Sequence, residues 1–391
     1  MKTCLVSLVS DQTIPNILVA LHFHFDFLLL LSTTEMEEKG KSQAILDTLK
    51  LRGRNYDDAH HILKVEPDSI INLQTEVTRW IDNTPDDFHF IVNLTGGTKL
   101  MSIAAFTLFT DYDNTMVYVP IPRNEYLIPF PKRRPKAPVP LDSRLSVKEY
   151  LTAYNVEITN QRHLEDAKNL ALYRHELTRF IYQHYQEVQP LLEWFGDHLR
   201  PLKPRKVKKG YDFAEDCNFG MENEAQKYIL DKMGFGYENG SIRKVINESD
   251  WNYLRGGWLE ERIFLAIQAA LPRLTDVQLG IKIKDQRGNE NELDVVFTRD
   301  NTLYLVECKS PGAAEGEERG AAGTIIAFLY KQGALRQQFG LTPKVFLATT
   351  TDTIYEADGQ VKAHLLDRAR QFQGEIIPLL NVLNLEAYFE E

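Results

Sequence analysis

One stretch of the chain, residues 294–309, constrains the fold more than any other. It reads DVVFTRDNTLYLVECK, in which two runs rich in β-branched and aromatic residues flank a polar pair, Asp300 and Asn301. Such runs favour β-strands, and a two-residue polar pair between them is typical of a tight β-hairpin. We therefore predict an antiparallel hairpin with strands at residues 292–299 and 302–310.

Charged residues lie inside this apolar hairpin. Side chains alternate between the two faces of a strand, so Glu307 and Lys309 share one face and Cys308 points to the other. Pairing of the strands brings Asp294 close to Glu307. Buried carboxylates are costly unless something pairs with them, and a divalent cation does so. The hairpin is therefore a candidate metal site; the alternative is a solvated edge hairpin with ordinary surface charges.

The bulk properties favour a soluble cytoplasmic protein that makes no membrane contact. A length of 391 residues suggests two or three domains, and the three cysteines are far apart, which fits a reducing compartment. His22, His24 and Asp26 interrupt the apolar run at residues 16–31, which is too short to span a bilayer. A net charge of −10 argues against constitutive coating of nucleic acid but is compatible with a nuclease.

The first 130 residues alternate between strand and helix patterns. This alternation predicts a doubly wound, Rossmann-like α/β domain at residues 1–130. The expected strands are residues 5–9, 27–32, 61–65, 88–94 and 115–119. One helix is expected to begin at Pro15, and the others are expected at residues 35–51, 68–81 and 98–110.

Two loops of this domain follow strands, where ligands of open α/β sheets bind. The first contains Ser10, Asp11, Gln12 and Asn16. The second, residues 93–99, reads NLTGGTK and leads into a helix. Its backbone amides, hydroxyl groups and helix dipole suit an anionic phosphate, although it has neither P-loop spacing nor the dinucleotide fingerprint. A glycine turn that only caps the helix is the alternative.

Together the two loops resemble those of the CARF domain of CRISPR-associated proteins. The resemblance implies a Rossmann-like homodimer that binds a cyclic oligoadenylate across its two-fold axis. By analogy it extends to the segment TTEM at residues 33–36. The implied ligand-binding residues are Ser10, Asp11, Gln12, Asn16, Thr33, Met36, Asn93, Thr95, Gly96, Gly97, Thr98 and Lys99.

The hairpin resembles the pattern of the PD-(D/E)XK nuclease superfamily, which is an Asp, a spacer and then Glu-x-Lys. Asp294, Glu307 and Lys309 fit this pattern, although the proline that often precedes the Asp is absent. The resemblance implies that the carboxylates bind Mn²⁺ or Mg²⁺ and that the lysine positions or activates the attacking water. It places a restriction-endonuclease-like domain at residues 221–391.

The same resemblance gives roles to two further helices. The helix expected at residues 256–271 carries Glu260 and Glu261, and in this superfamily a glutamate there can add a metal contact. Glu260 is the candidate for catalysis and metal binding, although Glu261 could point inward instead, or the helix dipole alone could favour a glutamate. The helix expected at residues 324–339 would contact the nucleic acid backbone through Lys331, Gln332 and Arg336.

The segment between the two units, residues 131–220, combines a proline-rich linker with connecting helices, one of them predicted at residues 164–185. Nothing in it indicates catalysis. Its histidines lack metal-ligand spacing and are expected to be ordinary surface or core residues: His163, His175, His184 and His198.

A CARF sensor joined to a PD-(D/E)XK domain resembles the single-CARF ancillary nucleases of type III CRISPR systems. The resemblance implies a homodimeric antiviral endonuclease that is activated allosterically by cyclic tetra-adenylate. Its substrate would be single-stranded RNA, single-stranded DNA or supercoiled DNA that it nicks. The alternative is a cyclic-oligoadenylate-sensing binding protein or transcriptional regulator with a non-cleaving nuclease-like domain. The complete set of Asp294, Glu307 and Lys309 favours the nuclease.

Overall fold

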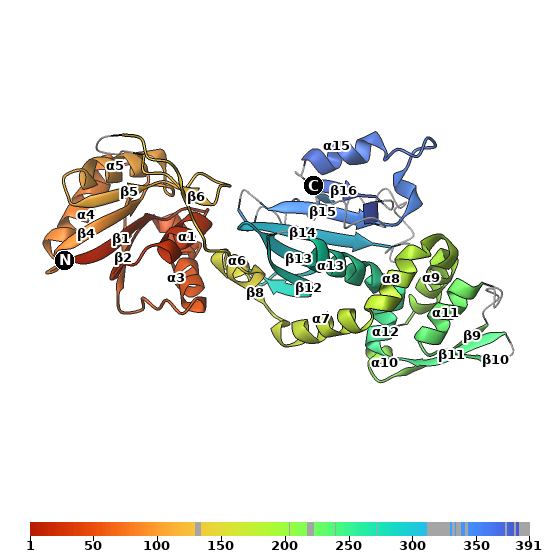
Figure 1. Ribbon diagram of the computed structural model, residues 1–391. Coiled ribbons are helices and arrows are strands. Elements are labelled where there is room, and N and C mark those ends of the chain that lie inside the picture. The colour runs from red at the N-terminus through yellow and green to blue at the C-terminus, as the bar shows by residue number, and fades with distance from the viewer. Residues whose placement is uncertain are drawn as a thin grey trace.

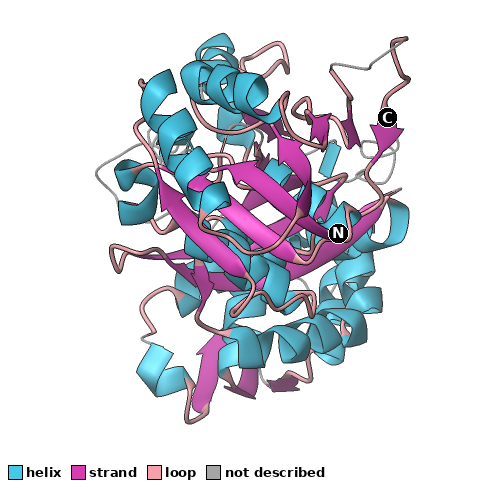
Figure 2. Cartoon of the chain, turned by 90° about the vertical axis from the view of Figure 1, so that its left-hand side faces the viewer, coloured by secondary structure: helices cyan, strands magenta, loops and turns pink. Residues whose placement is uncertain are grey.

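The chain, described here from a computed structural model, has two sheet-based halves joined by a mainly helical segment (Figure 1). The two sheets and the helices around them are also seen in a view turned by 90° (Figure 2). Among the helices described, none is both long and apolar enough to cross a bilayer. The structure describes residues 1–129, 134–202, 204–216, 223–238, 240–271, 273–310, 329–330, 333, 338–340, 343–371, 374–378 and 381–382.

The first half is built on a five-stranded parallel sheet with the strand order β3-β2-β1-β4-β5. Its central strands are apolar and buried on both faces, as expected for a parallel sheet covered by helices. The doubly wound α/β fold expected from the sequence is confirmed. The strands are β1 (Lys2–Leu8), β2 (Phe27–Ser32), β3 (His60–Lys64), β4 (Phe88–Asn93) and β5 (Asn114–Val117).

Helices cover both faces of this sheet. Helices α1 and α3 pack on the face that carries Leu28, and helices α4 and α5 pack on the face that carries Leu29. The single helix expected at residues 35–51 is wrong, because the chain breaks at Gly40, whose φ of 61° favours glycine. The helices are α1 (Ile14–His22), α2 (Thr34–Glu38), α3 (Lys41–Leu51), α4 (Ile70–Asp82) and α5 (Lys99–Phe109).

The connecting segment is mainly helical. The single helix expected at residues 164–185 is also wrong, because three helices change direction at Arg174 and His184, whose ψ angles are 1° and 26°. The elements are β6 (Glu125–Tyr126), β7 (Val139–Pro140), α6 (Val147–Ala153), β8 (Glu157–Ile158), the 3-10 turn η1 (Gln161–His163), α7 (Leu164–Tyr173), α8 (His175–Gln183), α9 (Tyr185–Leu199) and α10 (Pro204–Val207).

The second half is built on a six-stranded mixed sheet with the order β16-β15-β14-β13-β12-β8. The predicted hairpin is present as β13 and β14, and its turn residues Asp300 and Asn301 have φ angles of 49° and 60°. Helix α13 packs against β12, β13 and β14. The elements are α13 (Trp258–Ala270), β12 (Leu274–Lys284), β13 (Glu290–Arg299), β14 (Thr302–Lys309), β15 (Lys344–Thr349), η3 (Asp352–Ile354), α15 (Ala363–Gln371) and β16 (Gly374–Ile377).

A small antiparallel sheet with the order β10-β11-β9 lies beside these elements and was not predicted from the sequence. Its apolar side packs with α9 and α11 through residues such as Phe195, Phe213 and Ile242. The elements are β9 (Tyr211–Asp216), α11 (Glu224–Lys232), β10 (Gly236–Glu238), β11 (Ser241–Ile246), α12 (Glu248–Asn252) and a π-helical turn, η2 (Tyr253–Gly257).

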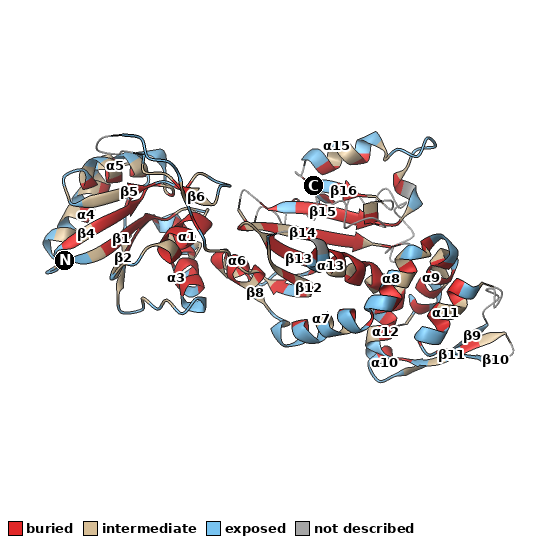
Figure 3. Cartoon of the chain, viewed as in Figure 1, coloured by how far each residue is buried: buried red, intermediate tan, exposed pale blue. Residues whose placement is uncertain are grey.

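Burial is greatest along the two large sheets (Figure 3). One apolar cluster crosses from the first half to the second, since it contains Ile17 of α1, Tyr150 of α6 and Leu305 of β14. Helix α6 therefore packs between the two halves and makes them share part of their core.

The tip of the β13–β14 hairpin is bound to the chain that leaves the first half. The buried Asn301 side chain donates hydrogen bonds to Asn124 Oδ1 at 2.7 Å and to the carbonyl of Ser143 at 2.9 Å. It also accepts the backbone N–H of Leu145 at 2.8 Å. Arg144 donates to the neighbouring Asp300 carboxylate at 3.3 Å. The hairpin thus joins the two halves at one end.

We predict that Asn301→Gly lowers the free energy of unfolding by roughly 2–3 kcal/mol, because it leaves buried groups without their hydrogen-bonding partner. Glycine tolerates the positive φ, so the backbone of the turn should not be strained. Urea denaturation measures the change. The matched control is Asp300→Asn in the same turn, which loses only partly exposed ion pairs and should cost about 1 kcal/mol or less. Equal losses in the two variants would contradict the role given to Asn301.

Candidate functional site

Asp294 and Glu307 lie on neighbouring strands, next to the paired residues Val295 and Val306 of the hairpin. The Asp294 carboxylate accepts the backbone N–H of Cys308 at 2.7 Å. Glu307 is buried, and its carboxylate pairs with Lys309 Nζ at 3.1 Å. The structure therefore brings together the three residues that the sequence pattern singled out.

The electrostatics of these groups show how closely they interact. Burial and the nearby charge of Glu307 raise the pKa of Asp294 to about 7. Burial alone would lower the pKa of Lys309, but the charges of Glu307 and Asp294 outweigh it and raise that pKa. The lysine is thus held in its charged form between carboxylates whose repulsion it only partly offsets.

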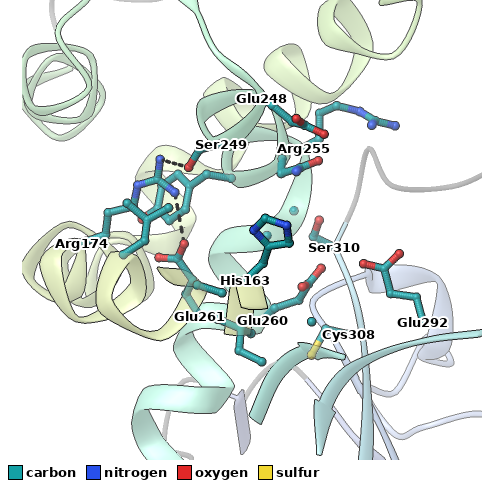
Figure 4. Close-up of a pocket in the computed structure, with 18 of the residues that line it drawn as sticks. His163, Arg174, Glu248, Ser249, Arg255, Glu260, Glu261, Glu292, Cys308 and Ser310 are labelled. Carbon is teal, nitrogen blue, oxygen red and sulfur yellow. Dashed lines mark hydrogen bonds and ion pairs between the residues drawn. The ribbon is translucent and has the colours of Figure 1, made fainter. Parts of the chain in front are cut away.

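Glu260 of α13 joins this group from the neighbouring helix. Burial raises its pKa well above the ordinary value, and the charge of Asp294 adds to the shift. Glu261 instead faces Arg174, which donates to its carboxylate at 3.2 Å (Figure 4). The sequence left open which of the two glutamates points toward the hairpin. In the structure it is Glu260, and not Glu261, that lies near Asp294.

A network of buried charged side chains holds the start of α13 on the side that carries Glu261. Arg174 donates to Asp250 at 3.2 Å as well as to Glu261, and Lys244 of β11 pairs with Asp250 at 2.7 Å. Burial raises the pKa of Glu261 to about 7, although Arg174 lowers it. These contacts hold the start of α13 and with it the position of Glu260.

The described side chains do not form a ready cluster of three or more metal-ligating residues. Two carboxylates are instead occupied by protein groups, Asp294 by the N–H of Cys308 and Glu307 by Lys309. The donor chemistry nonetheless fits a hard divalent cation, because the carboxylates of Asp294, Glu307 and Glu260 repel one another in a largely buried place. Modest rotation of these side chains would be needed to bind it.

A cavity of about 580 Å³ opens beside the carboxylates. Glu260, Cys308 and Lys309 form part of its wall, and His163 lines it from the connecting segment. Figure 4 shows the imidazole of His163 pointing into this cavity. His163 is a surface residue, as expected, and pairing of β8 with β12 brings it to this cavity. The candidate backbone contacts Lys331, Gln332 and Arg336 lie outside the described residues.

The two candidate ligand loops lie at one edge of the first sheet. Strands β1 and β4 are adjacent and parallel, so residues 10–16 and residues 93–99 follow neighbouring carboxyl ends. At Gly96 a Cβ atom would lie 2.0 Å from the carbonyl oxygen of Leu8. Only glycine fits there without movement of the backbone, so this glycine is needed for the close approach of the two loops.

Burial divides the residues predicted to bind the ligand. Thr33 caps α2 by accepting the N–H of Met36, and Asn16 donates to the carbonyl of Leu8 at 2.8 Å. Such contacts maintain the shape of the loops, whereas the more exposed members are available to a ligand. Buried are Asn16, Thr33, Met36, Asn93 and Gly96; partly exposed are Ser10, Gln12, Thr95 and Gly97; exposed are Asp11, Thr98 and Lys99.

The first loop also contacts the helix between the halves. The hydroxyl group of Tyr154, at the end of α6, donates to Gln12 Oε1 at 3.4 Å. The hydroxyl group of Tyr150 in the same helix donates to the carbonyl of Phe339 at 3.3 Å. A change in the ligand loop therefore has a direct contact through which it can reach the second half.

Comparison with known proteins gives a family match in each half of the chain. Residues 4–150 match the family model of the Card1 CARF domain, and residues 247–372 match the model of the Card1-like endonuclease domain. No curated protein matches the chain.

Solved structures share the fold over nearly the whole chain. Protein VC1899 from Vibrio cholerae has 17% identity and a TM-score of 0.75, covering 99% of this chain and 97% of its own. Can2 from Sulfobacillus thermosulfidooxidans, solved in complex with cyclic tetra-adenylate, has 19% identity and a TM-score of 0.73, covering 100% and 99%. The chain therefore belongs to the proteins that carry a Card1 CARF domain ahead of a Card1-like endonuclease domain.

Proposed function

We propose that this protein is a metal-dependent endonuclease, activated by a cyclic oligoadenylate, that acts in the cytoplasm in type III CRISPR antiviral defence. The observation that carries the proposal is the convergence of Asp294, Glu307, Lys309 and Glu260 beside a cavity in the endonuclease half. The CARF domain in the same chain supports gating by the nucleotide, and the complex of Can2 with cyclic tetra-adenylate favours that ring size.

The carboxylates of Asp294, Glu307 and Glu260 would hold Mn²⁺ or Mg²⁺. When bound, such an ion lowers the pKa of water and supplies positive charge at the scissile phosphate. Lys309 lies next to Glu307 and keeps its proton, so it is suited to orient the attacking water and to stabilise the developing negative charge. The chemistry supported is hydrolysis of a phosphodiester in RNA or DNA.

The edge of the first sheet that carries the two candidate ligand loops would bind the activator. Exposed Lys99 and the backbone of the GG turn suit phosphate groups, as the helix α5 N-terminus does. Leu100 and Ile103 are 38% and 48% exposed on α5 in the single chain, which supports a homodimer whose partner covers them. Binding would act on the nuclease half through Gln12, Tyr154 and α6.

The test of this function is a cleavage assay on single-stranded RNA, single-stranded DNA and supercoiled plasmid, with and without Mn²⁺ and with and without cyclic tetra-adenylate. Cleavage that requires both additions is the expected result. Tight activator binding without cleavage under any condition would instead favour the sensing protein or regulator that binds nucleic acid without cutting it.

We predict that Glu307→Ala lowers the cleavage rate by more than about a hundredfold. Loss of a residue that only hydrogen-bonds to a metal ligand typically costs about ten- to a hundredfold, and loss of the ligand itself should cost more. The affinity for cyclic tetra-adenylate should not change, as calorimetry can show. Glu290→Ala, at an exposed position of the neighbouring strand β13, is the control and should cleave normally. Normal cleavage by the Glu307 variant would remove that residue from the site.

We predict that Mn²⁺ affinity rises with pH through about 7. The folded protein keeps Asp294 protonated below its raised pKa of about 7, and the ion must displace that proton. Titration calorimetry in buffers of different ionisation enthalpy should show proton release at pH 6 and less at pH 8. Affinity that stays constant between pH 6 and pH 8 would contradict the raised pKa of Asp294.

We predict that Lys99→Ala weakens activation by cyclic tetra-adenylate by on the order of tenfold, because a charge-assisted contact to phosphate is lost. Mn²⁺ binding should be unaffected. Lys2→Ala, an exposed lysine at the amino end of β1 and away from the loops, is the matched control. An unchanged activation curve for the Lys99 variant would exclude this lysine as a ligand contact.

A further inference from the structure

The cavity beside the candidate metal site is lined by several carboxylates. A phosphodiester strand is itself anionic, so it needs hydrogen-bond donors or cations on the same walls. Two cationic residues of the lining, Arg174 and Lys309, are paired with carboxylates. The acidic lining residues are Glu248, Glu260, Glu261 and Glu292.

His163 supplies a donor whose position is fixed by the backbone around it. The Asn160 side chain donates to the carbonyl of Gly280 at 2.8 Å and accepts the N–H of Lys282 at 2.9 Å. The N–H of His163 in turn donates to the carbonyl of Asn160 at 2.9 Å. The turn that carries His163 is therefore attached to β12, the strand beside the hairpin of the site.

The imidazole ring itself is exposed and directed into the cavity (Figure 4). Among the described residues no hydrogen bond holds either ring nitrogen of His163. The turn that carries His163 is firmly attached, and the imidazole ring is directed at solvent inside the cavity. The ring is therefore available to bind a molecule that enters the cavity.

Arg255 lines the same cavity from the π-helical turn that precedes α13. Its guanidinium lies over the Trp251 ring, 4.2 Å from the centroid, which restricts its position. The turn is tight, because a Cβ at Gly257 would lie 2.9 Å from the carbonyl oxygen of Asn252. Arg255 and Glu260, on either side of that turn in the sequence, both line the cavity.

We propose that His163 and Arg255 form a phosphate-binding wall, which holds the nucleic acid strand at phosphates next to the one that is cleaved. The proposal rests on the function proposed above, since it names how that cavity holds its substrate. Contacts to phosphate carry no sequence information, so this wall would strengthen binding of RNA or DNA strands of any sequence to a similar degree.

The first test measures binding, without cleavage, in the Glu307→Ala background. Fluorescence anisotropy with single-stranded oligonucleotides of two unrelated sequences should show affinity lowered by about tenfold for added His163→Ala, and equally for both. His163→Asn, which keeps an N–H donor, should recover part of the loss. His175→Ala, an exposed histidine outside the cavity lining, is the control and should bind as the parent does.

The second test uses salt. Each phosphate neutralised in a single strand contributes about 0.7 to the slope of log affinity against log salt concentration. Arg255→Gln should lower that slope by about this amount and Arg255→Lys should restore it. Because Arg255 also stacks on Trp251, thermal melting must show that both variants are folded.

The outcomes separate this proposal from the nuclease assignment. If the protein with intact Glu307 does not cleave but the His163 and Arg255 effects on binding are present, the nuclease fails and the wall stands. If His163→Ala binds and cleaves like the parent, or if the parent binds no oligonucleotide, the wall is overturned. In the active protein the same substitution should raise KM and leave kcat nearly unchanged.

Discussion

Repulsion between the carboxylates of Asp294, Glu307 and Glu260 is the interaction on which the second half depends. Burial makes this repulsion strong, as the raised pKa values of Asp294 and Glu260 show, and Lys309 offsets only part of it. Such an arrangement persists only when the surrounding structure holds it in place. Two strands hold Asp294 and Glu307 together, and α13 holds Glu260 against them.

The small sheet and the connecting helices help to hold α13 in place. Arg174 stands between two connecting helices and reaches Glu261 and Asp250, while Lys244 of the small sheet reaches Asp250 as well. These pairs surround the start of α13 on the side away from the cavity. The tip of the hairpin is bound through Asn301 to the chain that leaves the first half, so both α13 and the hairpin are held in place.

The sequence predicted what depends on near neighbours. The alternation of residues in the hairpin and the pair Asp300 and Asn301 determine strands and turn locally, as does the pattern of the first sheet. The choice between Glu260 and Glu261 could not be predicted, since adjacent helix positions differ by about 100° and Arg174, 87 residues away, decides it. The place of His163 at the cavity could not be predicted for the same reason, because Asn160 is attached to Gly280 across 120 residues.

The central claim is that these carboxylates form one metal site. Anomalous diffraction from crystals soaked in Mn²⁺ tests it most directly. The account predicts a single strong peak at about 2.1 Å from oxygen atoms of Asp294, Glu307 and Glu260, with the Lys309 side chain moved away from Glu307. A peak elsewhere, or no peak while Glu307 keeps its pair with Lys309, would contradict it.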